Sequence, residues 1–292
     1  MMRRITALFF FLGVYVLGFA ENTRGKEYIL VLNSINFNEA WANQNILDEF
    51  SSPGFHVEAE ELSIPMMTRI EEVEEKREYL LSRYLKPPKV VVFIGDPAWL
   101  VCQPLFDKEW KDIPTVICYS RDSMPGNLEN FVNKDFLGEG KFVLTEVATA
   151  GYNLTVIKQP FYVKNTIDLI RRLQPEVKKI ALISDDRYIS AMVREEVCGV
   201  LEKDFPELKL DLLTSIDIST EKLLDTLMGY SREVGIIYNS WFVGKKQSES
   251  HYLSDNLQKI IYGFVDAPVF TLTEMDMETG AFAGGYFISA SD

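Results

Sequence analysis

Short apolar runs recur along the chain, and each ends abruptly in polar residues. The clearest run is 180–183, which continues into the polar residues 184–187 and then into a helical pattern over 188–203. An apolar run of this length followed by a helix indicates a buried strand of a parallel sheet. We expect comparable strands at residues 28–32, 90–94, 113–119, 208–214, 235–238 and 269–272, and a strand nearer a sheet edge at 55–62, where apolar and polar residues alternate.

Apolar residues at helical spacing separate these runs. Ile167, Ile170 and Leu173 share one face of a predicted helix. That helix must stop near Gln174, because the residue before a proline is pushed out of the helical region. Further helices are predicted at 39–50, 66–84, 188–203, 221–230 (with Ser219 as its N-cap) and 253–264, whereas 123–140 is predicted to be a loop.

Strands that alternate with helices predict parallel sheets joined by right-handed crossovers. The stretch 152–188 follows one complete α/β unit and leads into a second. We therefore expect a two-lobed α/β fold, in which each lobe is a mostly parallel sheet flanked by helices. The N-terminal lobe is predicted over 21–158 and the C-terminal lobe over 159–280, with 281–292 returning to the first lobe. A helix should follow such a return, so we expect the natural protein to extend beyond Asp292.

The N-terminus has the pattern of a secretory signal peptide. Arg3 and Arg4 precede an apolar run over 5–19, and Gly18 and Ala20 place small residues before a cleavage site at Glu21. The alternative is an uncleaved membrane anchor, although the run is shorter than the ~20 residues of a spanning helix. We predict a signal peptide over 1–20 and a periplasmic or other extracytoplasmic location.

The net charge and the cysteines argue against nucleic-acid binding and against a disulfide-stabilised fold. The net charge of -13 disfavours nucleic acid as a partner, because phosphate contacts need clustered lysine and arginine. The three cysteines, Cys102, Cys118 and Cys198, do not form a disulfide framework, and we expect Cys118 and Cys198 to be small buried side chains. A bridge between Cys102 and Cys118 stays open at this stage.

The sequence contains no recognisable catalytic constellation. Its two histidines, His56 and His251, have no cysteine or carboxylate beside them at metal-ligand spacing. Nucleophile-elbow, phosphate-loop and zinc-protease motifs are absent from the sequence. We therefore predict neither catalysis by this chain nor a metal or cofactor, which makes an α/β hydrolase the least favoured reading.

Polar and aromatic residues follow several predicted strands. The carboxyl ends of parallel strands are where open α/β sheets bind their ligands, and a small-molecule cleft needs apolar faces with a few hydrogen-bonding groups. For each residue, a loop cap, a core aromatic or a surface ion pair is the alternative. The candidates are Asn36, Phe37, Asp96, Ser120 and Arg121 in the first lobe, and Asp186, Arg187, Tyr188, Asn239, Trp241, Thr273 and Glu274 in the second. A sugar, an amino acid or a carboxylate would suit such a set, and a partner protein is the alternative.

Several segments resemble the type I periplasmic binding-protein fold. They are residues 153–155 (NLT), 173–184 (LQPEVKKIALIS), 268–272 (PVFTL) and 280–286 (GAFAGGY). The resemblance is to the branch shared by substrate-binding proteins of ABC transporters and the extracytoplasmic sensor regions of bacterial, often hybrid, histidine kinases. Residues 183–190 (ISDDRYIS) and 238–242 (YNSWF) are more similar to the sensor version.

The resemblance implies that two hinged lobes close on a small ligand. In the sensor version, closure is passed to a membrane-anchored kinase portion of the same protein, whose catalytic region lies outside this chain. The alternative is a free periplasmic substrate-binding protein that delivers its ligand to an ABC permease.

Overall fold

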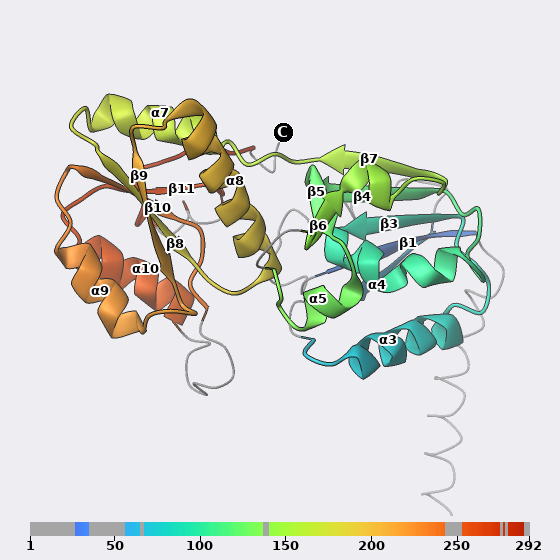
Figure 1. The fold of residues 1–292 in the computed structure, drawn as a ribbon. Coiled ribbons are helices and arrows are strands. Elements are labelled where there is room, and N and C mark those ends of the chain that lie inside the picture. Colours follow the sequence, from blue (N-terminus) through green and yellow to red (C-terminus); the bar gives the residue numbers. More distant parts are fainter. Residues whose placement is uncertain are drawn as a thin grey trace, which may run out of the picture.

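The computed structural model describes residues 27–34, 56–64, 67–136, 140–242, 253–274, 277 and 280–288. It has two lobes side by side, each built on its own parallel sheet (Figure 1). This is the predicted two-lobed α/β fold. The predicted signal peptide, the helix at 39–50 and the candidates Asn36 and Phe37 lie outside the described residues.

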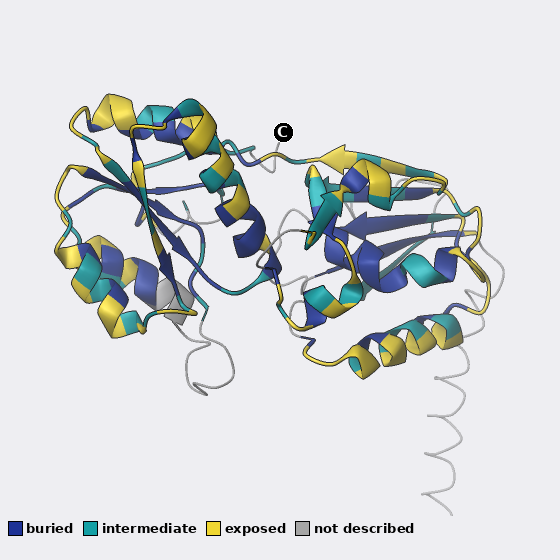
Figure 2. Ribbon diagram, viewed as in Figure 1, coloured by how far each residue is buried: buried dark blue, intermediate teal, exposed yellow. Residues whose placement is uncertain are grey.

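The first lobe contains a five-stranded sheet of order β2-β1-β3-β4-β7, and all of its paired strands are parallel. Every residue of β1 is buried, as a strand covered on both faces requires. The edge strand β2 is half-buried throughout, in agreement with its alternating sequence. Figure 2 shows β3 mostly in dark blue (buried) and the outer side of α3 in yellow (exposed). The elements are β1 (Tyr28–Asn33), β2 (His56–Glu61), α3 (Ile70–Arg83), β3 (Val90–Ile94), α4 (Asp96–Phe106), β4 (Thr115–Ser120) and β7 (Leu154–Lys158).

The connection between β4 and β7 has more structure than the sequence pattern predicted. The expected loop at 123–140 contains a strand and a short helix, so that prediction is wrong in part. The antiparallel pair of β5 (Ser123–Pro125) and β6 (Phe142–Leu144) encloses α5 (Leu128–Val132), and α6 (Thr145–Ala148) follows. Glycine and proline mark turns here, but the buried Met124, Phe131 and Phe136 give the segment a core of its own.

The second lobe contains a four-stranded parallel sheet of order β11-β10-β8-β9. The helix predicted to stop near Gln174 has Gln174 as its C-cap, and Ser219 caps α9 by accepting a hydrogen bond from the Lys222 N–H group. The elements are α7 (Val163–Leu173), β8 (Lys179–Ser184), α8 (Tyr188–Asp204), β9 (Lys209–Thr214), α9 (Thr220–Met228), β10 (Val234–Tyr238), α10 (Leu253–Phe264) and β11 (Val269–Thr271).

Residues 281–288 lie along the second sheet. Gly284 forms a parallel bridge with Phe270 of β11, and the Ala283 N–H group donates to the Val269 carbonyl oxygen at 2.7 Å. The sequence pattern predicts that 281–292 returns to the first lobe. In the described part of this segment the contacts are instead with β11, because the apolar Ala281 and Phe282 are buried in the second lobe's core. Residues 289–292 lie outside the described residues.

Hydrophobic packing joins the two lobes. One buried cluster contains Phe93 and Trp99 of the first lobe together with Tyr188 and Val193 of the second. A separate cluster fills the other face of the second sheet. The start of α8 therefore lies on the lobe interface rather than on a free surface. Within the described residues, no helix is long and apolar enough to cross a membrane.

Candidate functional site

The carboxyl ends of β3 and β8 meet between the lobes. Asp96 follows β3 as the first residue of α4, and Tyr188 follows β8 as the first residue of α8. The Tyr188 hydroxyl donates to Asp96 Oδ2 at 3.0 Å, and both side chains are buried. Two residues that the sequence placed at the ends of strands in different sheets are therefore in direct contact.

Asp96 is held by the turn that ends β3. Gly95 adopts a φ of +88°, a left-handed conformation that glycine reaches without strain. The Ser34 hydroxyl donates to the Gly95 carbonyl oxygen at 3.2 Å and accepts from the Ala98 N–H group at 3.0 Å. Burial raises the pKa of the Asp96 carboxyl, and its contacts with Ser120, Tyr188 and Arg121 offset only part of that effect. Its Oδ1 atom is buried and has no hydrogen-bond partner within the described chain.

Arg121 lies directly after the end of β4. Its guanidinium carbon is 3.8 Å from the centre of the Phe161 ring, which is a cation–π contact across the segment that joins the lobes. Nη1 makes a long hydrogen bond of 3.5 Å to Gln159 Oε1, and the buried Nε has no partner among the described residues. Burial lowers the pKa of Arg121, whereas the nearby Asp96 opposes this. The guanidinium therefore keeps unused donor capacity.

Aromatic rings surround Tyr188. The ring centres of Phe131, Phe136 and Phe142 lie 5.8, 6.0 and 6.4 Å from that of Tyr188. All three phenylalanines come from the segment between β4 and β7, which therefore packs on the second lobe. The sequence does not identify them as interface residues, because nothing in the local pattern distinguishes an interface aromatic from a core aromatic.

Arg187 is committed to an internal ion pair. Its Nη2 and Nε atoms lie 2.8 and 3.0 Å from Asp185 Oδ2, and its backbone N–H group donates to Asp185 Oδ1 at 3.0 Å. The Ser240 hydroxyl donates to the same Oδ2 at 2.8 Å. Asp185 therefore holds the start of α8 and the end of β10 together, and Arg187, paired with it, has less capacity than Arg121 to take an external anion.

The remaining candidates divide between the interface and the second lobe's core. Asp186 Oδ2 lies 3.6 Å from Lys134 Nζ of the first lobe. Asn239 bonds Ser190 and Ser240, and Trp241 is 3% exposed with its indole N–H group donating to Thr220. Thr273 and Glu274 form the turn after β11, where the Thr273 N–H group donates to Thr271 Oγ1. Ser120 is fully buried beside Asp96.

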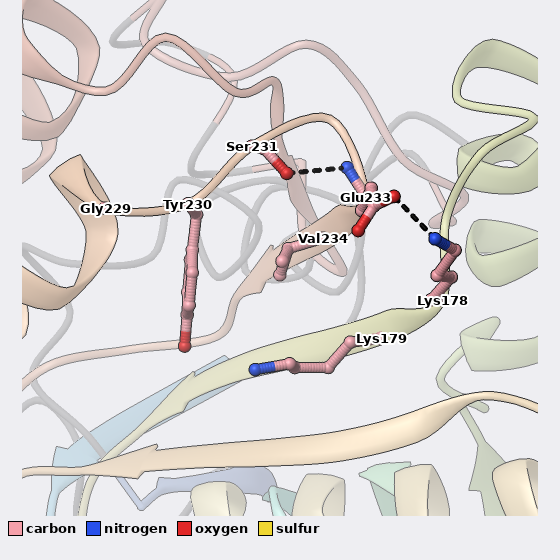
Figure 3. Close-up of a pocket in the computed structure, with 7 residues that line it drawn as sticks. All are labelled: Lys178, Lys179, Gly229, Tyr230, Ser231, Glu233 and Val234. Atoms are coloured by element: carbon pink, nitrogen blue, oxygen red, sulfur yellow. Dashed lines mark hydrogen bonds and ion pairs between the residues drawn. The ribbon is translucent and has the colours of Figure 1, made fainter.

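A hollow of about 380 Å³ lies at the opposite edge of the second sheet (Figure 3). Lys178, Lys179, Tyr230 and Glu233 line it, at the amino ends of β8 and β10. Lys178 pairs with Glu233 at 2.6 Å and Lys179 with Asp211 at 3.1 Å, so its charges are balanced internally. It lacks the convergent, unpaired polar groups that the lobe interface offers.

The described residues contain no group of three or more histidine, cysteine, aspartate or glutamate side chains that could hold a metal ion.

Cys102, Cys118 and Cys198 are free thiols, so the structure contains no Cys102–Cys118 bridge. Burial raises the pKa of the Cys102 thiol to about 12, which keeps it protonated at neutral pH.

No family model matches the sequence, and no curated protein matches it. Solved structures do. A conserved domain protein from Vibrio cholerae aligns at 16% identity over 89% of this chain and 78% of its own, with a TM-score of 0.56. The ABC domain from Streptococcus pneumoniae in complex with L-Trp aligns at 17% identity over 91% and 80%, with a TM-score of 0.55.

A branched-chain amino acid transporter substrate-binding protein from Streptococcus pneumoniae, in complex with isoleucine, aligns at 12% identity over 87% of this chain and 67% of its own, with a TM-score of 0.51. The structural neighbours are type I periplasmic binding proteins, so the chain has their two-lobed fold. At these identities the likeness concerns the fold alone.

Proposed function

We propose that this chain binds a small molecule between its lobes and that binding favours their closure. The observation that carries the proposal is the meeting of Asp96 and Tyr188, which brings the carboxyl ends of two parallel sheets together. Open α/β sheets bind ligands at this edge, and a ligand that prefers the closed arrangement shifts the population toward it. Arg121 and Asp96 supply the polar groups with unused hydrogen-bonding capacity.

The lobes are proposed to span 21–158 and 159–280, with export directed by residues 1–20. An extracytoplasmic location agrees with the periplasmic binding proteins that share the fold. The ligand classes are amino acids, sugars and small carboxylates. L-Trp and isoleucine are bound by two of the fold's relatives, which supports testing amino acids first. A role in binding rather than catalysis also agrees with those relatives.

The closure is proposed to act in signalling, as the sensing domain of a two-component histidine kinase. This part rests on the resemblance of residues 183–190 and 238–242 to the sensor branch. The second candidate is a free substrate-binding protein of an ABC importer, which the transporter-associated relative supports. Mass spectrometry of the protein from its native membrane and periplasmic fractions separates them: a kinase-linked polypeptide in the membrane supports the sensor, and a soluble periplasmic polypeptide supports the importer.

Thermal unfolding of residues 21–292 against a panel of amino acids, sugars and carboxylates tests ligand binding. A ligand at a hundredfold excess over its dissociation constant stabilises the folded state by about 2.7 kcal/mol. For a carboxylate-bearing ligand, Arg121→Gln should abolish the shift, while Arg172→Gln on the exposed side of α7 should retain it. No shift with any member of the panel would contradict small-molecule binding and favour a protein partner.

A further inference from the structure

One face of α8 docks on the first lobe. Tyr188, Met192 and Glu196 are spaced four residues apart and so lie on the same side of the helix. Tyr188 bonds Asp96, and the Ser123 hydroxyl lies 4.0 Å from the sulfur of Met192. Glu196 interacts electrostatically with Arg121 and Asp122. Figure 1 shows α8 on the side of the second lobe that faces the first, so this face becomes exposed if the lobes separate.

The surface that receives α8 is a buried, charged corner. Asp96 is 2% exposed, although it carries a carboxyl group at the start of α4. Its Oδ1 atom and the Nε atom of Arg121 are both buried without a hydrogen-bond partner in the described chain. A charged group that is buried with incomplete hydrogen bonding is costly, and protonation of a carboxyl relieves that cost.

The charged groups around this corner come from α4, α6, α8, β7 and the residues directly after β4. Asp96 faces Tyr188 of α8 and Arg121 after β4. Glu196 faces Arg121 and Asp122. Asp122 is itself paired with Lys158 at 2.9 Å, and Lys158 also contacts Glu146 of α6 at 3.3 Å. The Arg121 guanidinium therefore lies near the buried carboxyl of Asp96 and the half-buried carboxyl of Glu196, and near Asp122, which is already paired with Lys158.

We propose that the face of α8 formed by Tyr188, Met192 and Glu196 is a proton-linked clasp, so that uptake of a proton at the lobe interface favours the closed arrangement. The inference deepens the proposed function, on which it rests, because the same closure would bind the ligand. It predicts that the closed fraction rises in mildly acidic surroundings even when no ligand is present.

The direction of the pH dependence follows from the carboxyls of Asp96 and Glu196. Burial raises the pKa of Glu196 to about 7, with Arg121 opposing and Asp122 adding to the effect, and burial also raises the pKa of Asp96. In separated lobes both groups would be solvated and titrate near their ordinary values, about 4. The closed arrangement therefore binds more protons between pH ~4.5 and ~7, and its advantage is lost as the pH rises through that window.

Small-angle X-ray scattering of the ligand-free chain from pH 7.5 to 5.5 tests the clasp through the radius of gyration. We expect the ratio of closed to open molecules to rise about tenfold over this range. Glu196→Gln, which mimics the protonated side chain, should remain closed at pH 7.5 and lose most of the pH dependence. Glu195→Gln is the matched control, because Glu195 is the exposed neighbour on the same helix.

Each outcome decides the proposal. A wild-type profile that does not change with pH overturns it, and so does a Glu196→Gln profile that follows the wild type. Loss of the pH response in Glu195→Gln also overturns it, because the response would then depend on overall charge. Asp96→Asn provides a second variant whose profile should shift in the same direction as that of Glu196→Gln. These scattering measurements contain no ligand. A result that overturns the proton-linked closure therefore does not affect the test of ligand binding, and a ligand panel without any shift does not contradict the proton-linked closure.

Discussion

Asp185 shows how one buried side chain connects two strand ends. It is fully buried after β8, where it accepts hydrogen bonds from Arg187 and from Ser240 after β10. We predict that Asp185→Asn lowers the free energy of unfolding by about 2 kcal/mol, between the values for exposed and fully buried ion pairs. The reason is that Arg187 keeps its position but loses its counter-charge. Urea denaturation followed by tryptophan fluorescence measures the change.

The control for this variant is the neighbouring Asp186. Its carboxylate is half-buried and lies 3.6 Å from Lys134, so Asp186→Asn should cost less than ~1 kcal/mol. Burial alone would raise the pKa of Asp185, but the charge and hydrogen bonds of Arg187 lower it. The stabilisation is therefore present above pH ~4 and is lost as the pH falls through the lowered pKa. Equal effects of the two variants at pH 7 would show that the ion pair adds nothing.

At the scale of elements, the segment after β11 depends on a close backbone approach. A Cβ atom added at Gly285 would lie 1.9 Å from the Thr271 carbonyl oxygen, so a larger residue forces this segment away from β11. We predict that Gly285→Ala lowers the free energy of unfolding by about 2–3 kcal/mol. Urea denaturation measures it, and an unchanged midpoint would show that residues 281–288 do not pack on the second sheet as the structure describes.

Substitution of a second glycine by alanine should raise the free energy of unfolding rather than lower it. Gly199 lies inside α8, and a Cβ atom added there meets nothing within 4 Å. Because alanine has a higher helix propensity, Gly199→Ala should stabilise the protein by about 0.5–1 kcal/mol. The expected result is a higher urea midpoint with an unchanged slope. A decrease in stability would mean that this side of α8 is covered.

Elements were largely predictable from the sequence, because their signals are local. The apolar run at 180–183, the proline after Gln174 and the cap at Ser219 each specify backbone geometry within a few residues. The small hairpin and helix between β4 and β7 were missed because their stability comes from contacts with distant residues. Likewise, the turn residues at 273–280 do not indicate that the next segment pairs with β11.

At the scale of the whole molecule, the sequence placed polar residues at strand ends but not relative to one another. The contact between Asp96 and Tyr188 joins residues 92 positions apart in the sequence, and a local hydrophobic pattern cannot predict a contact over such a separation. Trp241 illustrates the reverse: it follows a strand, yet it is buried in the second lobe's core beside α9. Met192 and Glu196 could have been selected, since each lies four residues further along the face that begins at Tyr188.

The contact between Tyr188 and Asp96 makes closure itself sensitive to a single hydroxyl. Tyr188→Phe keeps the ring among its three phenylalanine neighbours but leaves Asp96 Oδ2 buried without this donor. An unsatisfied buried acceptor costs about 1–3 kcal/mol in the closed arrangement, whereas water satisfies it in the open one. The ratio of closed to open molecules should therefore fall about 5- to 150-fold, and the radius of gyration at pH 7.5 should increase.

Tyr79→Phe is the control for the loss of a tyrosine hydroxyl. Tyr79 is exposed on α3. Its hydroxyl makes long bonds of 3.3 Å to Glu60 and accepts one of 3.2 Å from Arg83 Nη1, away from the lobe interface. This variant should scatter like the wild type. If Tyr188→Phe also scatters like the wild type and retains its thermal stability, the interface bond does not hold the lobes together. If Tyr188→Phe opens the lobes and weakens any ligand found in the panel by a similar factor, closure and binding are the same equilibrium.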